Sequence, residues 1–243
     1  MKKTIKEILL EKTTLLEKEI EYLIRSQKVI VNGEKILLPS LKYEENDITF
    51  EILENKKSYV SRGAYKLLKA IEEFKLDIKN KVCLDIGSST GGFVQVLLEN
   101  DAKKVYAVDC GTNQLDYSLR INEKVVTYEK TNLKNLNKDY FLEKLDFVSC
   151  DVSFISLKHV FLVCNKIMEP NTYIMALIKP QFEASSKYVS KGGYVDEQYH
   201  EFLINRVKEY AKENNFEFVE LKPSPILGDK SKNTEYISLF RKV

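Results

Sequence analysis

The pattern of apolar and polar residues changes near residue 60. Before it, helical spacing predicts a short helix over residues 6–11 and a second helix after Thr14, whose hydroxyl is spaced to form a capping box with Glu17. The second helix carries four apolar residues at helical spacing, Leu16, Ile20, Leu23 and Ile24. Asn32-Gly33 separates two β-rich runs and predicts a hairpin, and residues 47–52 alternate as a further strand. Together these elements predict a small α+β module.

Beyond residue 60 the pattern predicts a larger domain that begins with a helix. Ser61 is expected to cap this helix, while Lys66 and Lys69 fall outside its apolar stripe. The stripe consists of Ala64, Leu67, Leu68, Ile71 and Phe74. Five apolar runs then predict strands over residues 82–86, 104–109, 125–129, 145–151 and 173–179. Further helices are expected to begin near Gly91, Asn113, Ser156 and Asp196.

The alternation of strands and helices predicts the topology of this domain. Strands joined through helices form a parallel sheet with both faces covered. Residues 216–222 and 235–241 have no helix between them, so we expect these two strands to pair antiparallel at one edge. The chain is therefore predicted to hold an α+β domain over residues 1–55, a linker over 56–60, and an α/β Rossmann-like domain with a mostly parallel seven-stranded sheet over 61–243.

Composition excludes several other classes of protein. With 243 residues, 44% of them hydrophobic, the chain can bury a core and is not a disordered or fibrous protein. The longest apolar stretch, residues 173–178, is far shorter than the ~18 residues of a membrane span. Acids at Glu7 and Glu11 interrupt any secretory signal. We therefore expect a soluble, cytoplasmic protein without a membrane partner.

The cysteines indicate neither disulfides nor a metal site. Cys83, Cys110, Cys150 and Cys164 show no Cys-x-x-Cys spacing, and each lies in or beside an apolar run. Neither histidine stands near paired cysteines, which disfavours zinc. We expect reduced cysteines that contribute packing, and no bound metal. The formal net charge is only +2, so any basic surface must be local.

A glycine-rich turn follows the first strand of the larger domain. The segment Lys81-Val-Cys-Leu-Asp-Ile-Gly-Ser-Ser-Thr-Gly-Gly-Phe runs from a strand into a helix, which is where α/β sheets bind ligands. The dinucleotide fingerprint needs a glycine where this chain has Ser89, which disfavours a nicotinamide cofactor. Asp109 ends the next strand, where it suits ribose hydroxyls. Ribose recognition without pyrophosphate indicates S-adenosylmethionine, and Asp85 either caps the loop or contacts the cofactor's amino group.

Two charged residues end neighbouring apolar strands. Asp151 precedes Val152-Ser153-Phe154, and Lys179 precedes Pro180-Gln181-Phe182. In this topology both lie at adjacent strand ends, beside the cofactor. Enzymes that methylate exocyclic amines commonly carry Asn/Asp-Pro-Pro-aromatic at the former place, and Asp151-Val-Ser-Phe does not match. The sequence therefore favours oxygen as the methyl acceptor.

Five motifs occur in order along the chain: Ser61-Arg-Gly-Ala-Tyr-Lys-Leu, Asp85-Ile-Gly-Ser-Ser-Thr-Gly-Gly-Phe, Cys150-Asp-Val-Ser-Phe-Ile-Ser, Lys179-Pro-Gln-Phe-Glu and Asn233-Thr-Glu-Tyr. Together they resemble the TlyA family, the haemolysin A-type, FtsJ-like rRNA 2′-O-methyltransferases. The likeness covers nearly the whole chain, because residues 1–60 resemble the S4 RNA-binding module of that family. It implies methylation of the ribose 2′-OH, of cytidine, in ribosomal RNA.

The resemblance also implies which residues form the site. The family's catalytic tetrad corresponds to Lys66, Asp151, Lys179 and Glu235. The expected cofactor contacts are Asp85, Gly87, Ser89, Thr90, Gly91, Gly92, Phe93, Asp109, Asn132 and Asp151. The 2′-OH is a poor nucleophile, so positioning carries much of the rate. Lys179 could take its proton only if burial and a like charge such as Lys66 disfavour the ammonium form; whether it does so or merely orients the hydroxyl stays open.

The RNA contacts must come from local faces. Residues 1–60 contain eleven basic and eleven acidic side chains, so Arg25, Lys28 and Lys35, around the hairpin, are the candidates for phosphate contacts, against a plain lysine-rich surface. Arg62 suits either an rRNA phosphate or the linker. Residues 183–193 are predicted to form a mobile flap beside Lys179, or else a plain surface loop.

Two other functions fit the sequence less well. A membrane-active haemolysin would need a spanning segment or a basic amphipathic helix, and neither is visible. A non-catalytic ribosome-assembly factor would use the cofactor only structurally, yet all four tetrad positions are filled. We therefore expect a monomeric enzyme whose partner is ribosomal RNA or a ribosomal subunit.

Overall fold

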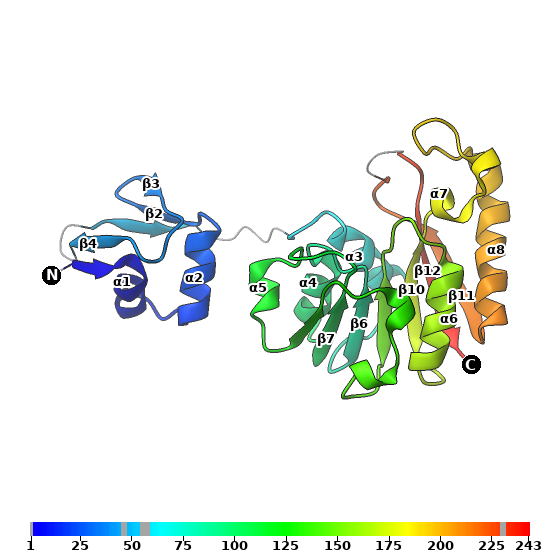
Figure 1. Ribbon diagram of the computed structural model, residues 1–243, viewed down its shortest axis with the longest axis horizontal. Helices are drawn as coiled ribbons and strands as arrows, with labels where there is room; N and C mark the ends of the chain where they lie inside the picture. Colours follow the sequence, from blue (N-terminus) through cyan, green and yellow to red (C-terminus); the bar gives the residue numbers. More distant parts are fainter. Residues whose placement is uncertain (1, 45–47, 54–58, 229–231) are drawn as a thin grey trace. The chain divides into compact units, whose positions relative to one another are not determined.

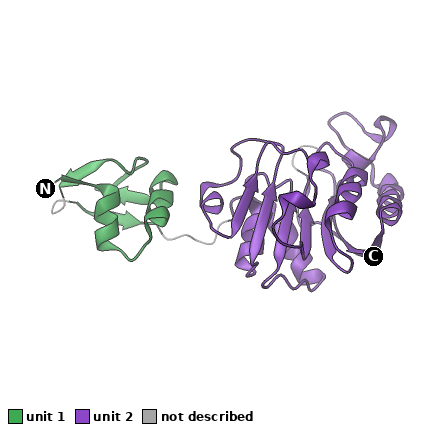
Figure 2. Cartoon of the chain, turned by 60° about the horizontal axis from the view of Figure 1, so that its bottom comes forward, with its two compact units in different colours: residues 1–58 green, residues 59–243 purple. Residues whose placement is uncertain are grey.

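The computed structural model describes residues 2–44, 48–53, 59–228 and 232–243. By its internal contacts the chain divides into two compact units, Met1–Ser58 and Tyr59–Val243, which Figure 2 shows in different colours. Asp47, at the start of a predicted strand, and residues 56–58 of the expected linker lie outside the described residues. Each unit is described by itself below.

The first unit is a small α+β fold. Its elements are β1 (Lys2–Thr4), α1 (Ile5–Lys12), α2 (Glu17–Arg25), β2 (Val29–Val31), β3 (Glu34–Lys35), β4 (Lys42–Glu44) and β5 (Phe50–Ile52). Strand β2 pairs antiparallel with β3 and β5, while β1 pairs with β4. The predicted hairpin is confirmed, because Asn32 and Gly33 join β2 to β3 with positive φ angles of 51° and 85°. Both helices bury apolar side chains against the strands, among them Ile5, Ile20 and Ile24.

The start of α2 differs from the prediction. The capping box expected between Thr14 and Glu17 does not form, because the helix begins later, at Glu17. There the backbone N–H of Leu16 donates to Glu19 Oε2 at 2.7 Å. Leu16 is consequently 71% exposed, although its spacing predicted that it belongs with the apolar residues of this helix. A capping box forms instead at the start of α1, between Thr4 and Glu7, which was not predicted from the sequence.

The second unit contains the predicted seven-stranded, mostly parallel sheet (Figure 1). Its strands are β6 (Val82–Ile86), β7 (Lys104–Val108), β8 (Val125–Tyr128), β9 (Phe147–Cys150), β10 (Tyr173–Ile178), β11 (Phe216–Pro223) and β12 (Tyr236–Lys242). Their order is β11-β12-β10-β9-β6-β7-β8, and β12 runs antiparallel to both of its neighbours, β10 and β11. Neighbouring strands β6, β9 and β10 therefore end side by side at one edge of the sheet.

Helices cover both faces of this sheet, as predicted. Helices α3 (Ala64–Glu73), α4 (Gly92–Glu99) and α5 (Tyr117–Arg120) pack in one apolar cluster, and α6 (Leu157–Ile167) and α8 (His200–Glu213) pack in the other. The short helices are η1 (Leu133–Asn135), η2 (Lys138–Tyr140), α7 (Pro180–Glu183), η3 (Ser186–Tyr188) and η4 (Glu197–Tyr199). Ser156 caps α6 as expected, accepting from the backbone N–H of Lys158 at 3.2 Å.

Three local predictions in the second unit were wrong. Ser61 does not cap α3, whose N-cap is Gly63. Helix α5 begins at Tyr117 rather than near Asn113, because the carboxylate of Glu129 holds the backbone N–H of Asn113 and Asp116 caps the helix instead. Cys110 is exposed, whereas the other three cysteines are buried and unpaired as predicted. None of the helices within the described residues is long and apolar enough to cross a membrane.

Candidate active site

The glycine-rich turn after β6 is shaped by the close approach of β9. Gly87 has a φ of +82°, and a Cβ placed on it would lie 2.6 Å from the backbone oxygen of Asp151. Gly91 has a φ of +99° and faces Leu119 closely. Each position therefore tolerates only glycine without strain. The turn brings the start of α4 next to the end of β9, and so places the loop residues beside Asp151.

Asp85 lies beneath this turn as a buried carboxyl group with one free oxygen. The residue is 1% exposed, its Oδ1 accepts from Ser149 Oγ at 2.7 Å, and its Oδ2 has no hydrogen-bond partner. Burial raises the pKa of Asp85 to about 7, although the bond from Ser149 acts in the opposite direction. Within the described residues Asp85 does not cap the loop, so that alternative was wrong. Its free oxygen can accept from a ligand.

Asp109 fixes the conformation of the loop. Its Oδ2 accepts from the backbone N–H of Ser89 at 2.8 Å, and its Oδ1 accepts from that of Gly111 at 2.7 Å. Each carboxylate oxygen can still accept a further bond. Asn132, further along the chain, caps η1 by accepting from the backbone N–H of Lys134 at 3.0 Å. Asp109, Gly91 and Asn132 do not line the pocket described next.

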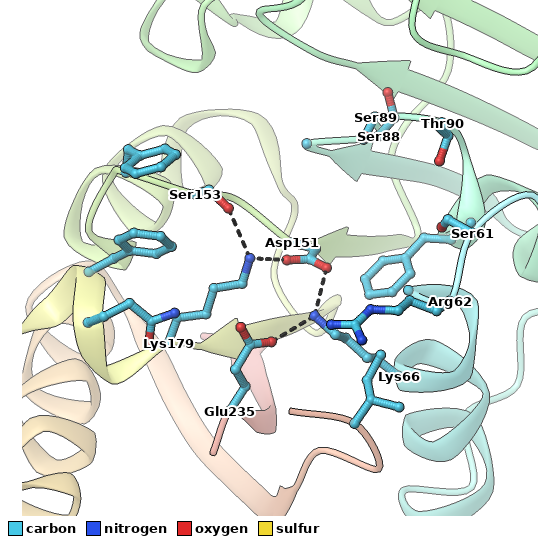
Figure 3. Close-up of a pocket in the computed structure, with 18 of the residues that line it drawn as sticks. Ser61, Arg62, Lys66, Ser88, Ser89, Thr90, Asp151, Ser153, Lys179 and Glu235 are labelled. Atoms are coloured by element: carbon cyan, nitrogen blue, oxygen red, sulfur yellow. Dashed lines mark hydrogen bonds and ion pairs between the residues drawn. The ribbon is translucent and has the colours of Figure 1, made fainter. Parts of the chain in front are cut away.

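A pocket of about 690 Å³ opens at the carboxyl edge of the sheet (Figure 3). This volume is typical of sites for small molecules and cofactors. The pocket brings together most of the residues predicted from the sequence: Arg62, Lys66, Asp85, Gly87, Ser89, Thr90, Gly92, Phe93, Asp151, Lys179 and Glu235. One end is formed by the glycine-rich turn and the other by charged side chains.

The four predicted catalytic residues form one chain of ion pairs. Lys66 Nζ lies 2.7 Å from Glu235 Oε2 and 3.3 Å from Asp151 Oδ2. Lys179 Nζ lies 2.5 Å from Asp151 Oδ1 and donates to Ser153 Oγ at 3.2 Å. Figure 3 shows Asp151 between the two lysines, with Glu235 beside Lys66. Four distant segments, α3 and the segments next to β9, β10 and β12, thus supply one constellation.

Charge balance explains how these groups can be buried. The exposed fractions of Lys66, Lys179 and Glu235 are 7%, 7% and 3%. Burial lowers the pKa of Lys66, but the neighbouring charges of Asp151 and Glu235 outweigh it, so the pKa is raised overall. Burial likewise raises the pKa of Asp151, but Lys179 and Lys66 outweigh it and the pKa is lowered. Lys66 and Asp151 are therefore held in their charged forms.

The residues predicted to contact RNA occupy different parts of the chain. Arg62 Nη2 donates to the backbone oxygen of Leu227 at 2.9 Å, which anchors a loop at the mouth of the pocket. Arg25, Lys28 and Lys35 belong to the first unit. Lys28 Nζ lies 5.1 Å from the centre of the Tyr22 ring. Arg62 thus binds a carbonyl of its own unit in the structure, and the other three lie in the small α+β fold.

Two residues at this site, Asn233 and Phe154, were not predicted from the sequence to have a role there. Asn233 is fully buried, and its side chain accepts from the backbone N–H of Val195 and donates to the backbone oxygen of Gly193, at 2.9 and 2.8 Å. It thereby fixes the predicted flap, whose Gly192 and Gly193 line the pocket. Phe154, at the pocket mouth, is 87% exposed. Both residues belong to motifs that the sequence analysis identified, Asn233-Thr-Glu-Tyr and Asp151-Val-Ser-Phe, and these motifs could have indicated them.

Comparisons with known proteins identify one matching family model and several related proteins. The family model described as FtsJ-like methyltransferase matches residues 59–242. The chain is 42% identical over 214 residues to Hemolysin A of Brachyspira hyodysenteriae, which covers 87% of this chain and 88% of that relative. It is 36% identical over 220 residues to the 16S/23S rRNA (cytidine-2'-O)-methyltransferase TlyA of Mycobacterium tuberculosis, covering 90% and 82%. The solved structure "Putative hemolysin from Streptococcus thermophilus" matches with 34% identity and a TM-score of 0.75, over 100% of this chain and 89% of that one.

Proposed function

The chain belongs to the FtsJ-like methyltransferase family, and we propose that it methylates the ribose 2′-OH of cytidine in ribosomal RNA, with S-adenosylmethionine as methyl donor. The Mycobacterium tuberculosis relative is named for that reaction on 16S and 23S rRNA. The observation that carries the proposal is the buried chain of ion pairs through Lys66, Asp151, Lys179 and Glu235, at one end of a pocket that begins at a glycine-rich turn.

Two carboxylates beside the glycine-rich turn fit S-adenosylmethionine: Asp85 lines the pocket, and Asp109 lies outside its lining. The free Oδ2 of Asp85 offers an acceptor for an ammonium group in a place where water is excluded. Asp109 lies after the neighbouring strand β7 and keeps acceptor capacity for ribose hydroxyls. The bound cofactor would supply an electrophilic methyl group on a sulfonium. We propose that Asp85 holds its amino acid end and that Asp109 holds its ribose.

The tetrad suits a hydroxyl acceptor. Lys179 Nζ is held by Asp151 and Ser153, so its position at the pocket wall is fixed before substrate enters. We propose that Lys179 contacts the 2′-OH and would align its oxygen for in-line attack on the methyl carbon of a bound cofactor. The C–O bond would form as the C–S bond breaks, and the hydroxyl proton would leave to water while the negative charge of Asp151 stabilises the positive charge that develops on the oxygen. Lys66 and Glu235 act through Asp151, because Lys66 bridges the two carboxylates.

The mouth of the pocket suits a nucleotide that leaves its stack. Phe154 is 87% exposed, has a left-handed φ of 62°, and packs against Phe182 with ring centres 5.0 Å apart. An exposed aromatic residue held in a strained conformation beside a pocket offers a face for a base. The first unit is proposed to act as an S4-like RNA-binding head that contacts phosphates through Arg25, Lys28 and Lys35.

The direct test is transfer of labelled methyl groups to ribosomal RNA. Purified 16S and 23S rRNA and isolated subunits would be incubated with the full-length protein and labelled S-adenosylmethionine, and the modified nucleotide mapped. Transfer to a cytidine 2′-OH is expected, and Lys179→Ala is expected to reduce kcat by about 10²–10⁴-fold while cofactor binding is retained. Cofactor binding by the wild type without transfer to any RNA would instead identify a non-catalytic assembly factor.

A further inference from the structure

A strip of aromatic and cationic side chains lies on η3, η4 and the first turns of α8. The ring of Tyr188 lies 4.7 Å from that of Tyr199 and 6.1 Å from that of Phe202, centre to centre. Lys187 Nζ stands 4.7 Å from the centre of the Tyr188 ring, and the guanidinium carbon of Arg206 stands 4.6 Å from that of Phe202. Phe202 is nevertheless 49% exposed. These five residues are called the α8 strip below.

The α8 strip is continuous with the proposed catalytic pocket. Arg206 Nη1 donates to the backbone oxygen of Glu183 at 2.9 Å, which fixes the guanidinium against α7. Glu183 directly follows Phe182, which lines the pocket and packs against Phe154. Figure 1 shows α7 beside α8 at this edge of the second unit. Arg206 is therefore attached to the same short helix, α7, that contributes Phe182 to the pocket.

One acid lies close to the cations of the α8 strip: the charge of Arg206 favours the ionised form of the buried Glu183 carboxyl group, although burial raises the pKa of that group overall. Within the part of the chain that the structure describes, neither Lys187 nor Arg206 forms an ion pair with a carboxylate. Arginines elsewhere in the second unit do: Arg120 pairs with Glu129 at 2.6 Å and Arg241 with Glu217 at 2.7 Å. The positive charge at the α8 strip thus stays available for an anionic partner.

We propose that the α8 strip binds the single-stranded RNA next to the target nucleotide, with one base stacked on Phe202 and Arg206 and a phosphate at Lys187. This proposal rests on the proposed function, because it takes the occupant of the pocket to be a nucleotide. Interleaved rings and unpaired cations match the chemistry of single-strand binding, in which bases stack on aromatic or guanidinium faces and cations follow the backbone.

The test compares variants of the full-length protein in two assays, steady-state methyl transfer to rRNA and equilibrium binding of a fluorescent RNA fragment that contains the target. Phe202→Ala and Phe202→Leu remove the flat ring, and Leu keeps apolar bulk against Tyr188. Phe218→Ala is the matched control, because Phe218 is also a 38% exposed ring under a lysine, with Lys208 Nζ 4.2 Å from its centre, but it lies on the edge strand β11. Lys187→Ala tests the phosphate contact.

Both Phe202 variants are expected to raise KM for rRNA and Kd for the fragment about tenfold, with a smaller change in kcat and an unchanged Kd for S-adenosylmethionine. Lys187→Ala is expected to reduce the slope of log Kd against log salt concentration by about one, the value for one phosphate contact. Phe218→Ala should bind like the wild type. Full RNA affinity of Phe202→Leu, or equal losses in Phe202→Ala and Phe218→Ala, would overturn the proposal but leave the proposed function standing. Failure of the wild type to methylate any rRNA would overturn both.

Discussion

The buried carboxyl group of Asp85 makes the stability of the protein without cofactor depend on pH. Its pKa is raised from 3.8 to about 7, so folding favours the protonated acid. The resulting stabilisation is complete below about pH 4 and is lost as pH rises toward 7 and above. Asp85→Asn fixes the side chain in a neutral form of the same shape, whose Oδ1 can still accept from Ser149 Oγ.

The size of the effect follows from the two pKa values. One pKa unit corresponds to about 1.4 kcal/mol, so ionising Asp85 in the folded state costs about 4 kcal/mol in total. Part of that cost is already present at pH 5, and the rest, about 2–3 kcal/mol, appears between pH 5 and pH 8. Because Asp85 is 1% exposed, solvent does little to reduce it. The unfolding free energy of Asp85→Asn, relative to that of the wild type, is therefore expected to increase by about 2–3 kcal/mol from pH 5 to pH 8.

The assay is urea unfolding at pH 5 to pH 8, without cofactor, followed by circular dichroism. The quantity of interest is the difference in unfolding free energy between Asp85→Asn and the wild type at each pH. Asp77→Asn serves as control, because Asp77 is exposed and its carboxylate binds only a neighbouring backbone N–H, that of Lys79 at 3.1 Å. A pH dependence confined to Asp85→Asn would then be due to the burial of its carboxyl group.

The same substitution should have the opposite effect on function. If Asp85 holds the cofactor's amino group, Asp85→Asn loses a charged hydrogen bond, and Kd for S-adenosylmethionine should rise at least about tenfold. A stability difference that stays constant from pH 5 to pH 8 would refute the argument from burial. Unchanged cofactor affinity with the expected pH dependence would refute the binding role alone.

Three further perturbations test other parts of the structure. Lys66→Met leaves two carboxylates without their shared cation, so urea unfolding should show a loss of about 3–5 kcal/mol, and adding Glu235→Gln should restore part of it. Gly87→Ala should lower the unfolding free energy by more than about 1 kcal/mol and raise Kd for the cofactor, because its Cβ meets the backbone oxygen of Asp151. Gly33→Ala is the control, because Gly33 has a similar φ but open space around it, so this variant measures the backbone strain alone. Ile24→Ala should remove about 2–5 kcal/mol from the small core of the first unit, and proteolysis should then cleave that unit while cofactor affinity is retained.

The sheet could be predicted well because its signal is local. Predominantly apolar runs placed β6 at its observed bounds and β10 within one residue, and the missing helix between the last two strands indicated their antiparallel pairing. The glycines of the turn after β6 could be predicted equally well, because few other residues adopt a left-handed backbone or allow another segment to approach so closely. The strands and the left-handed turn depend on neighbours in the sequence, whereas the atoms that Gly87 and Gly91 approach belong to distant residues, Asp151 and Leu119.

The environment of Lys66 could not be predicted from its helix. By spacing it falls off the apolar stripe of α3 and looks like a solvated lysine, yet it is 7% exposed. Its partners Asp151 and Glu235 are 85 and 169 positions away along the chain. Only the resemblance to a family with four charged residues suggested that they meet. The wrong capping box at Thr14 has a related cause, because competing caps lie within three residues and packing decides between them.

The charge balance of the tetrad bears on how the proton of the 2′-OH leaves. The site combines two basic and two acidic side chains, and each lysine lies within ion-pair distance of a carboxylate. Removal of a proton from this set would leave a net negative charge in a buried place, which is costly. A sulfonium in the adjoining pocket would bring a compensating positive charge. Proton loss from the tetrad should therefore be easier with cofactor bound, which favours an order in which the cofactor enters before the hydroxyl is activated.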